Sequence, residues 1–352
     1  MKTANVLMLL WFAIALALGQ SGLAGREGKK ESIRLAEPHY HAQLAPLLQG
    51  GSKRWDKSYL IAYGFDGTFS ATPSKPAVLA YDQNGQVNRE AIVWLNDAQA
   101  VSIGDAAVTK NGSLVLTASA LNKEGVISDF IASVGNDGHL SRVVRTSPFL
   151  PVYICSCDDE NTAWIYGMER SEPEKGYADS LRLRHYSFEK GEITAMLNIA
   201  GGTTGWTLSR GRYEGEINLR CNSKSVVLYN GATGDFYEYS IASNTLRTTK
   251  VAPLPAPSKV RLTGFALTES GDVFASMRYK SKQPPMGGLY KLGLDGKGGG
   301  FWAPVPGTVG PYLKDGTIER LLGTNGTELV HTRKLDGEAH WSKVERHSLP
   351  AQ

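Results

Sequence analysis

The chain has 352 residues, of which 41% are hydrophobic and 20% charged. This composition excludes a disordered polyampholyte, a collagen-like fibre and a multispanning membrane protein. The formal net charge of +4 gives no nucleic-acid footprint, and three cysteines are too few for a disulfide scaffold. The length itself fits one large all-β domain or two ordinary domains.

The first 24 residues have the three-part layout of a secretory signal peptide. Lys2 precedes the uncharged stretch 6–19, and small residues follow it, so we expect cleavage after Gly19 or after Ala24. The apolar stretch is shorter than the ~20 residues that a spanning helix needs. An uncleaved N-terminal anchor is the alternative. We therefore expect an exported protein, periplasmic or extracellular, with a flexible lead-in over 25–35 and no membrane span once the signal peptide (1–24) is removed.

A series of turn dipeptides repeats along the chain at a nearly constant interval. Its first residues are spaced by 53, 53, 53 and 52 positions, and its members are Asn84-Gly85, Asp137-Gly138, Lys190-Gly191, Ser243-Asn244 and Asp295-Gly296. Asn-Gly and Asp-Gly permit positive φ at both central positions of a type I′ turn, which suits tight β-hairpins. A second, less even series lies between them: Asn111-Gly112, 158–161, Asn222-Ser223, Ser270-Gly271 and Asn325-Gly326. Two interleaved series with one period predict a repeated four-stranded unit.

One such unit has predicted strands at 262–268, 273–279, 289–294 and 300–305, and another at 103–109, 114–119, 129–134 and 140–145. About 320 mature residues at ~53 per unit give six units. We therefore predict an all-β fold with a single domain over 36–352, a β-propeller of six four-stranded blades. The last unit (318–323, 328–333 and 340–347) lacks a fourth strand, which 32–35 or 37–44 could supply, so that an N-terminal strand closes the ring.

Two segments carry a resemblance to known propellers. Residues 105–119 (DAAVTKNGSLVLTAS) and 264–278 (GFALTESGDVFASMR) resemble the inner hairpin of exported six-bladed propellers of the broad TolB-like or NHL-like kind. The Pro-x-Gly entry and aromatic-Val-x-Asp exit of NHL units do not recur here. The resemblance therefore implies the fold and carries over no functional residue.

The connections divide the predicted propeller into two unlike faces. Hairpins between strands one and two, and three and four, are short and Gly-rich. The other connections are long and chemically diverse, as binding loops usually are: 65–76, 170–179, 201–216, 252–259 and 280–288. Loop 201–216 is the most unusual, and its candidate binding residues are Trp206, Arg210, Arg212, Tyr213 and Glu214. Arginine and aromatic residues dominate recognition surfaces; a solvated insertion that packs Trp206 on its blade is the alternative.

The cysteines offer one structural link between blades. Cys155 and Cys157 lie two apart on a predicted inner strand, and Cys221 falls at the equivalent place in the next blade. In an oxidising compartment one of the pair, Cys157 in the first instance, could form a disulfide with Cys221. Buried free thiols are the open alternative. A zinc site is disfavoured because no His neighbours them and the spacing of zinc ligands is missing.

Two functions remain in competition. The first is an exported, monomeric binding or scaffold protein without a cofactor, whose long-loop face binds a protein, peptide or glycan, and not nucleic acid. The second is a metal-dependent hydrolase or lyase, lactonase-like, with Ca²⁺ at the central channel. Asp105, Glu216 and Asn218 are its candidate ligands because they begin or lie in inner strands. No G-x-S-x-G, H-E-x-x-H, P-loop or dinucleotide motif occurs, which favours the binding protein.

Overall fold

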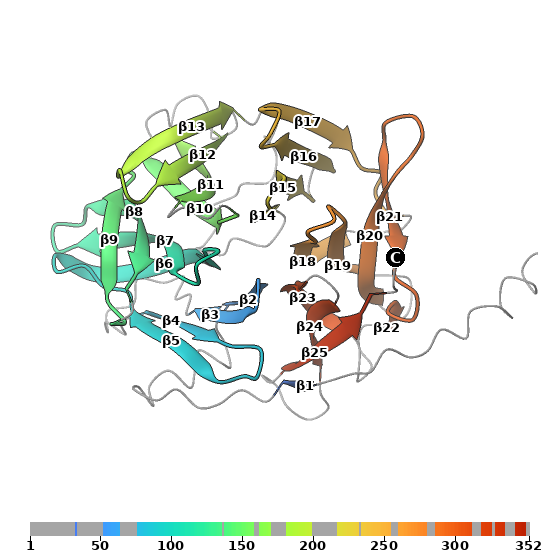
Figure 1. The fold of residues 1–352 in the computed structure, drawn as a ribbon, viewed down its shortest axis with the longest axis horizontal. Coiled ribbons are helices and arrows are strands. Elements are labelled where there is room, and N and C mark those ends of the chain that lie inside the picture. Colours follow the sequence, from blue (N-terminus) through green and yellow to red (C-terminus); the bar gives the residue numbers. More distant parts are fainter. Residues whose placement is uncertain are drawn as a thin grey trace, which may run out of the picture.

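The architecture was obtained as a computed structural model. It describes residues 32–33, 52–63, 76–135, 137–157, 162–169, 181–198, 217–231, 234–254, 260–279, 286–311, 318–325, 328–334 and 342–349. All named elements in these ranges are strands, and they form six antiparallel sheets arranged around a centre (Figure 1). The predicted six-bladed β-propeller is confirmed.

Each blade runs outward from an innermost strand, and successive strands pair in chain order. Blade 1 comprises β2 (Ser52–Asp56), β3 (Tyr59–Tyr63), β4 (Ala77–Tyr81) and β5 (Val87–Ile92). Blade 2 comprises β6 (Ala98–Val108), β7 (Leu114–Asn122), β8 (Ile127–Val134) and β9 (Leu140–Arg145). Blade 3 comprises β10 (Phe149–Cys155), β11 (Thr162–Glu169), β12 (Leu181–Ser187) and β13 (Glu192–Asn198). Blade 4 comprises β14 (Ile217–Cys221), β15 (Ser225–Asn230), β16 (Asp235–Ser240) and β17 (Thr245–Lys250). Blade 5 comprises β18 (Val260–Leu267), β19 (Val273–Tyr279), β20 (Met286–Leu294) and β21 (Gly300–Pro304). A short strand, β22 (Gly310–Pro311), adds to β20 and was not predicted.

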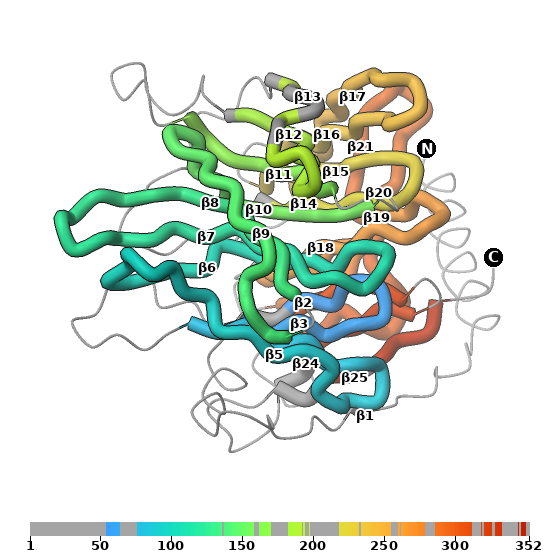
Figure 2. Tube along the Cα trace, turned by 60° about the vertical axis from the view of Figure 1, so that its left-hand side comes forward, coloured from blue at the N-terminus to red at the C-terminus, as the bar shows by residue number. Residues whose placement is uncertain are grey.

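Blade 6 combines the two ends of the chain. Its inner strands are β23 (Ile318–Thr324), β24 (Glu328–Lys334) and β25 (Ser342–Ser348), and β1 (Ser32–Ile33) pairs with β25 as the outermost strand. Both views place β1 beside β25 (Figures 1 and 2). The N-terminal closure is thus confirmed, by the first of the two predicted segments. Since β1 lies within the expected lead-in, the propeller begins at Ser32 and not after residue 35.

The core is divided among the interfaces between blades. Each of six buried hydrophobic clusters combines residues of two neighbouring blades, so the ring is packed all the way round. Strand β15 shows how the sequence achieves this. Val226 and Leu228 pack toward blade 3, whereas Val227 and Tyr229 pack toward blade 5. Because side chains alternate along a strand, an apolar run supplies both neighbouring interfaces at once.

The hairpin turns fall where the spacing predicts them, but their geometry differs from the type I′ prediction. In the β4–β5 turn, Gly85 donates to the Asp82 carbonyl (3.0 Å) and has a φ of 80°. Asp82 also donates to the Gln86 carbonyl (2.9 Å), the pattern of a type I turn followed by a glycine bulge, which needs only one residue with positive φ. In the β20–β21 turn that residue is Gly298 and not Gly296. The second predicted series also lies between strands one and two, except 158–161, which falls outside the described residues.

Candidate functional site

The strand order places the strand ends that flank all five long connections on the predicted face. Residues 65–76, 170–179 and 280–288 join the second and third strands of their blades, although Met286–Gly288 already belongs to β20, while 201–216 and 252–259 join one blade to the next. The candidate residues Trp206, Arg210, Arg212, Tyr213 and Glu214 lie in residues 199–216, outside the part of the chain that the structure describes. Their role stays a prediction.

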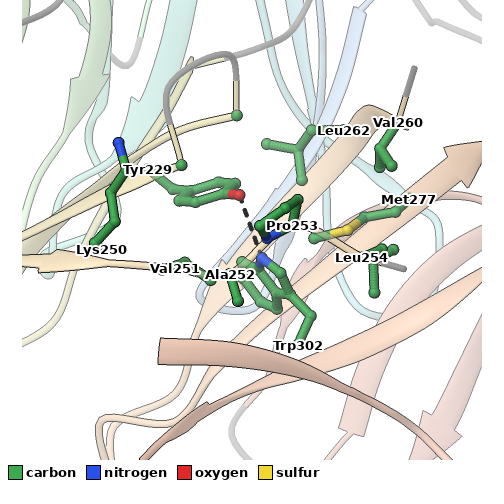
Figure 3. Close-up of a pocket in the computed structure, with 12 residues that line it drawn as sticks. Tyr229, Lys250, Val251, Ala252, Pro253, Leu254, Val260, Leu262, Met277 and Trp302 are labelled. Atoms are coloured by element: carbon green, nitrogen blue, oxygen red, sulfur yellow. Dashed lines mark hydrogen bonds between the residues drawn. The ribbon is translucent and has the colours of Figure 1, made fainter. Parts of the chain in front are cut away.

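A pocket of about 310 Å³ lies between blades 4 and 5 on this long-loop face (Figure 3). We call it the blade 4/5 pocket. The connection that follows β17 forms its rim through Ala252, Pro253 and Leu254. Strand residues form its walls, and they are mostly apolar: Tyr229, Val251, Val260, Leu262, Met277 and Trp302.

The rim of the pocket is fixed by backbone hydrogen bonds to both blades. Val251 donates to the Gly234 carbonyl (2.8 Å) in the β15–β16 turn, and Ala252 donates to the Gly300 carbonyl (2.7 Å) at the start of β21. Val251 and Gly300 also form a parallel β-bridge. The start of the connection is therefore attached to each side of the pocket, which makes this part of the rim preorganised.

Two aromatic side chains at the wall satisfy each other's polar groups. Trp302 Nε1 donates to the Tyr229 hydroxyl (3.3 Å), and the two rings meet edge to face at 5.2 Å. Tyr229 also stacks on Phe265 at 6.2 Å. Burial raises the pKa of Tyr229, so its hydroxyl stays protonated at neutral pH. At the rim, Lys250 is exposed and pairs with Asp235 (3.1 Å). The wall thus offers apolar surface, and the nearest charge lies at the edge.

The predicted channel residue Asp105 takes part in a buried ion pair. Arg54 Nη1 donates to Asp105 Oδ2 (3.0 Å) and to the Ile154 carbonyl (2.6 Å), so one side chain joins the inner strands of blades 1, 2 and 3. Tyr63 and the Ile154 amide also donate to the Asp105 carboxylate, at 2.9 and 3.1 Å. Burial alone lowers the pKa of Arg54, but the carboxylates of Asp105 and Asp56 outweigh it and hold that pKa above its usual value.

The other predicted metal ligands are not brought together with Asp105 by any contact that the structure shows. Asn218 lies in β14, opposite Tyr229 in the β14–β15 pair, and Glu216 falls outside the described residues. Within the described ranges, no group of three or more His, Cys, Asp or Glu side chains is placed to hold a metal ion. The metal site stays a prediction.

The three cysteines converge at the ends of β10 and β14. Cys155, Cys157 and Cys221 pack in the core cluster between blades 3 and 4, and the Cys221 thiol interacts with both others. All three are free thiols in the structure. Burial raises the pKa of Cys155 and of Cys221, so both are protonated at neutral pH. Cys157 and Cys221 share this cluster, and the disulfide between them stays a prediction.

Sequence reasoning missed the walls of the blade 4/5 pocket. It selected the connection 252–259. Met277 and Trp302 lay within predicted strands without any assigned role, and Tyr229 was not singled out. The order of the strands could have indicated these residues, because they lie on strands that meet beside the connection 252–259.

Comparison with known proteins supports the fold and goes no further. No family model matches the sequence, and no curated protein matches it. A protein from Bacteroides fragilis NCTC 9343, provisionally described as exported, has a similar structure with a TM-score of 0.55 at 11% identity, covering 95% of this chain and 98% of that chain. A luciferin-regenerating enzyme follows with a TM-score of 0.45 at 13% identity, covering 92% and 95% of the two chains. A protein of unknown function from Bacteroides caccae has a TM-score of 0.46 at 11% identity, covering 82% and 90%.

At these identities the similarity shows a shared propeller architecture alone. In the described part of the chain, no helix is long and apolar enough to cross a bilayer.

Proposed function

We propose that the protein is an exported binding protein that takes a bulky apolar side chain of a peptide or protein partner into the blade 4/5 pocket. The observation that carries the proposal is the position of this pocket, which lies on the long-loop face and has a rim held by hydrogen bonds to both blades. Its volume is at the lower end of the range of about 300–1,000 Å³ that small-ligand sites occupy. One large side chain suits that volume better than an extended ligand.

The chemistry of the wall favours a protein partner over a glycan. The hydroxyl groups of a sugar need hydrogen-bond partners when they are buried. Among the residues that line the pocket, none carries a carboxylate or an amide side chain, and the Tyr229 and Trp302 polar groups already bond to each other. Met277 adds a flexible thioether, which adapts to apolar groups of different shape. An aromatic or branched aliphatic side chain therefore fits best.

Export, and kinship with TolB-like or NHL-like propellers, belong to the same proposal. The apolar stretch at 6–19 and the likeness to a propeller described as exported support them. A binding role also agrees with the many unrelated propellers that use one face for recognition, although a fold alone assigns no function.

A peptide-selection experiment tests the pocket. A random peptide library is panned on the purified protein, and selected peptides are measured by calorimetry against Leu254→Arg, which places a long charged side chain at the rim. Leu294→Arg is the matched control, because Leu294 is 55% exposed at the end of β20, beside a tight turn on the opposite face. We expect peptides that share an aromatic or branched apolar residue, with Kd at least tenfold weaker for Leu254→Arg and unchanged for Leu294→Arg.

Two outcomes would contradict the proposal. One is a set of selected peptides that bind Leu254→Arg as tightly as the unchanged protein. The other is a glycan array on which the unchanged protein binds sugars and Leu254→Arg does not, which would assign the pocket to a different class of ligand.

A further inference from the structure

Around the centre of the ring, the described residues on or beside the inner strands carry more positive than negative charge. Blade 1 contributes Arg54, Asp56 and Lys57, and blade 2 contributes Asp105. Arg220 of β14 interacts electrostatically with Arg54, Asp105 and Asp56, and Arg320 of β23 interacts with Tyr63, which is hydrogen-bonded to Asp105. Four cations thus share two carboxylates.

Both carboxylates are already engaged by blade 1 and the backbone. The Asp105 oxygens accept from Tyr63, Arg54 and the Ile154 amide. Asp56 accepts from the Val108 amide (2.8 Å) and lies 3.9 Å from the Lys57 ammonium and 3.7 Å from Arg54. Lys57 itself donates to the carbonyls of Val108 and Ser156. The charges of Arg54 and Lys57 are therefore compensated within this network, and those of Arg220 and Arg320 are in excess.

Arg220 has donors left over. Its Nη1 donates to the Leu219 carbonyl (2.8 Å), its Nε is buried without a hydrogen-bond partner, and it forms no ion pair with any residue that the structure describes. Burial, and then repulsion from Arg54, lower the pKa of Arg220 to about 10, which still leaves it charged at neutral pH. Its Nε and Nη2 form one edge of the guanidinium fork, the edge that binds two oxygens of one anion side by side.

Arg320 supplies a second cation from another blade. It is exposed on β23, the inner strand of blade 6, and it makes no ion pair with a residue in the described ranges. Arg220 is only partly buried, so solvent reaches both side chains. Their strands, β14 and β23, are the innermost strands of blades 4 and 6 (Figure 1). A small anion entering from the centre of the ring would therefore meet two guanidinium groups that no described carboxylate compensates.

We propose that the central channel binds a small oxyanion, carrying carboxylate or phosphate oxygens, with Arg220 as the principal contact and Arg320 as the second. The anion compensates the charge excess, and it accepts from Arg220 Nε once a rotation of that side chain exposes this atom, which is buried without a partner in the structure. This site is separate from the blade 4/5 pocket, so neither proposal depends on the other.

Calorimetric titration tests the site directly. The purified full chain is titrated with inorganic phosphate, sulfate and succinate at constant ionic strength, alongside Arg220→Gln, Arg320→Gln and Arg220→Lys. Arg145→Gln is the matched control, because it removes the same charge from a side chain that is 55% exposed on β9. Thermal melts establish that each variant is folded.

We expect saturable binding of at least one of the three anions, weakened at least tenfold by Arg220→Gln and several-fold by Arg320→Gln. Arg220→Lys should give intermediate affinity, because an ammonium keeps the charge and loses the two-pronged geometry. Arg145→Gln should bind as the unchanged protein does. The preference between phosphate and succinate identifies the kind of oxyanion. Absence of saturable binding for all three anions would overturn the proposal, as would equal affinity in folded Arg220→Gln.

Discussion

The blade 4/5 pocket and the central channel lie on the same propeller but differ in the polarity of their side chains. The pocket wall is apolar, its two polar groups bond to each other, and backbone hydrogen bonds hold the start of its rim. The channel is charged, and Arg54 reaches across three blades to complete it. Removing one polar atom from the pocket wall leaves no buried charge behind. Removing one partner of the buried ion pair leaves the other charge uncompensated, which destabilises the fold far more. The two regions should therefore respond very differently to single substitutions.

The largest effect is expected at the channel ion pair. Asp105→Asn keeps the shape of the side chain and leaves the Arg54 charge without its closest carboxylate, so we expect a loss of about 3–5 kcal/mol in the free energy of unfolding. Urea denaturation measures it. Asp97→Asn is the control, because the Asp97–Arg145 pair is exposed and should cost no more than about 1 kcal/mol. Equal effects of the two substitutions would show that the channel pair is not a structural element.

An effect of similar or smaller size is expected from the cysteines beside the channel. If Cys157 and Cys221 are joined in protein purified without reductant, the denatured, unreduced chain contains one free thiol. Reduction should then lower the free energy of unfolding by roughly 3–4 kcal/mol, since the bond closes a long loop. Cys155→Ser should leave no free thiol and keep this sensitivity, whereas Cys221→Ser should abolish it. Three free thiols in the unchanged protein would exclude the disulfide.

The smallest effect is expected in the pocket wall. Tyr229→Phe removes the acceptor of Trp302 Nε1 and leaves that buried donor unpaired, which costs about 1–3 kcal/mol. Adding Trp302→Phe removes the donor as well, so the double variant should lose less than the two single variants combined. Thermal unfolding of all three gives the coupling energy. Strict additivity would mean that the hydrogen bond contributes nothing to the wall.

The sequence predicted the fold because the repeated strands and turns depend on residues that are close together in the chain. Turn residues must occupy particular backbone conformations, so their spacing near 53 residues revealed the blades before any contact was known. The turn type was wrong because the glycine bulge uses the same dipeptides as a type I′ turn, with positive φ at the glycine alone.

The sites could not be found this way because they depend on contacts between distant residues. Arg54 and Asp105 lie 51 positions apart, and Tyr229 and Trp302 lie 73 apart. Nothing in the local sequence of Arg220 distinguishes a paired arginine from one without a carboxylate. Asp105 was selected for its place in an inner strand, and it does lie in β6, but its partners are the Arg54 guanidinium, the Tyr63 hydroxyl and the Ile154 amide.

The two-residue strand β1 has a consequence for how the molecule is made. Strand β1 is synthesised before every other described strand of the propeller, whereas its partner, β25, is synthesised after all of them. Until β25 is made, β1 has no strand to pair with, and the ring cannot close. During that interval a β25 edge from one molecule can accept the β1 segment of another, because the exchanged contacts are identical. Domain-swapped oligomers, in which β1 of one molecule pairs with β25 of another, are therefore the expected by-product when many chains are made at once.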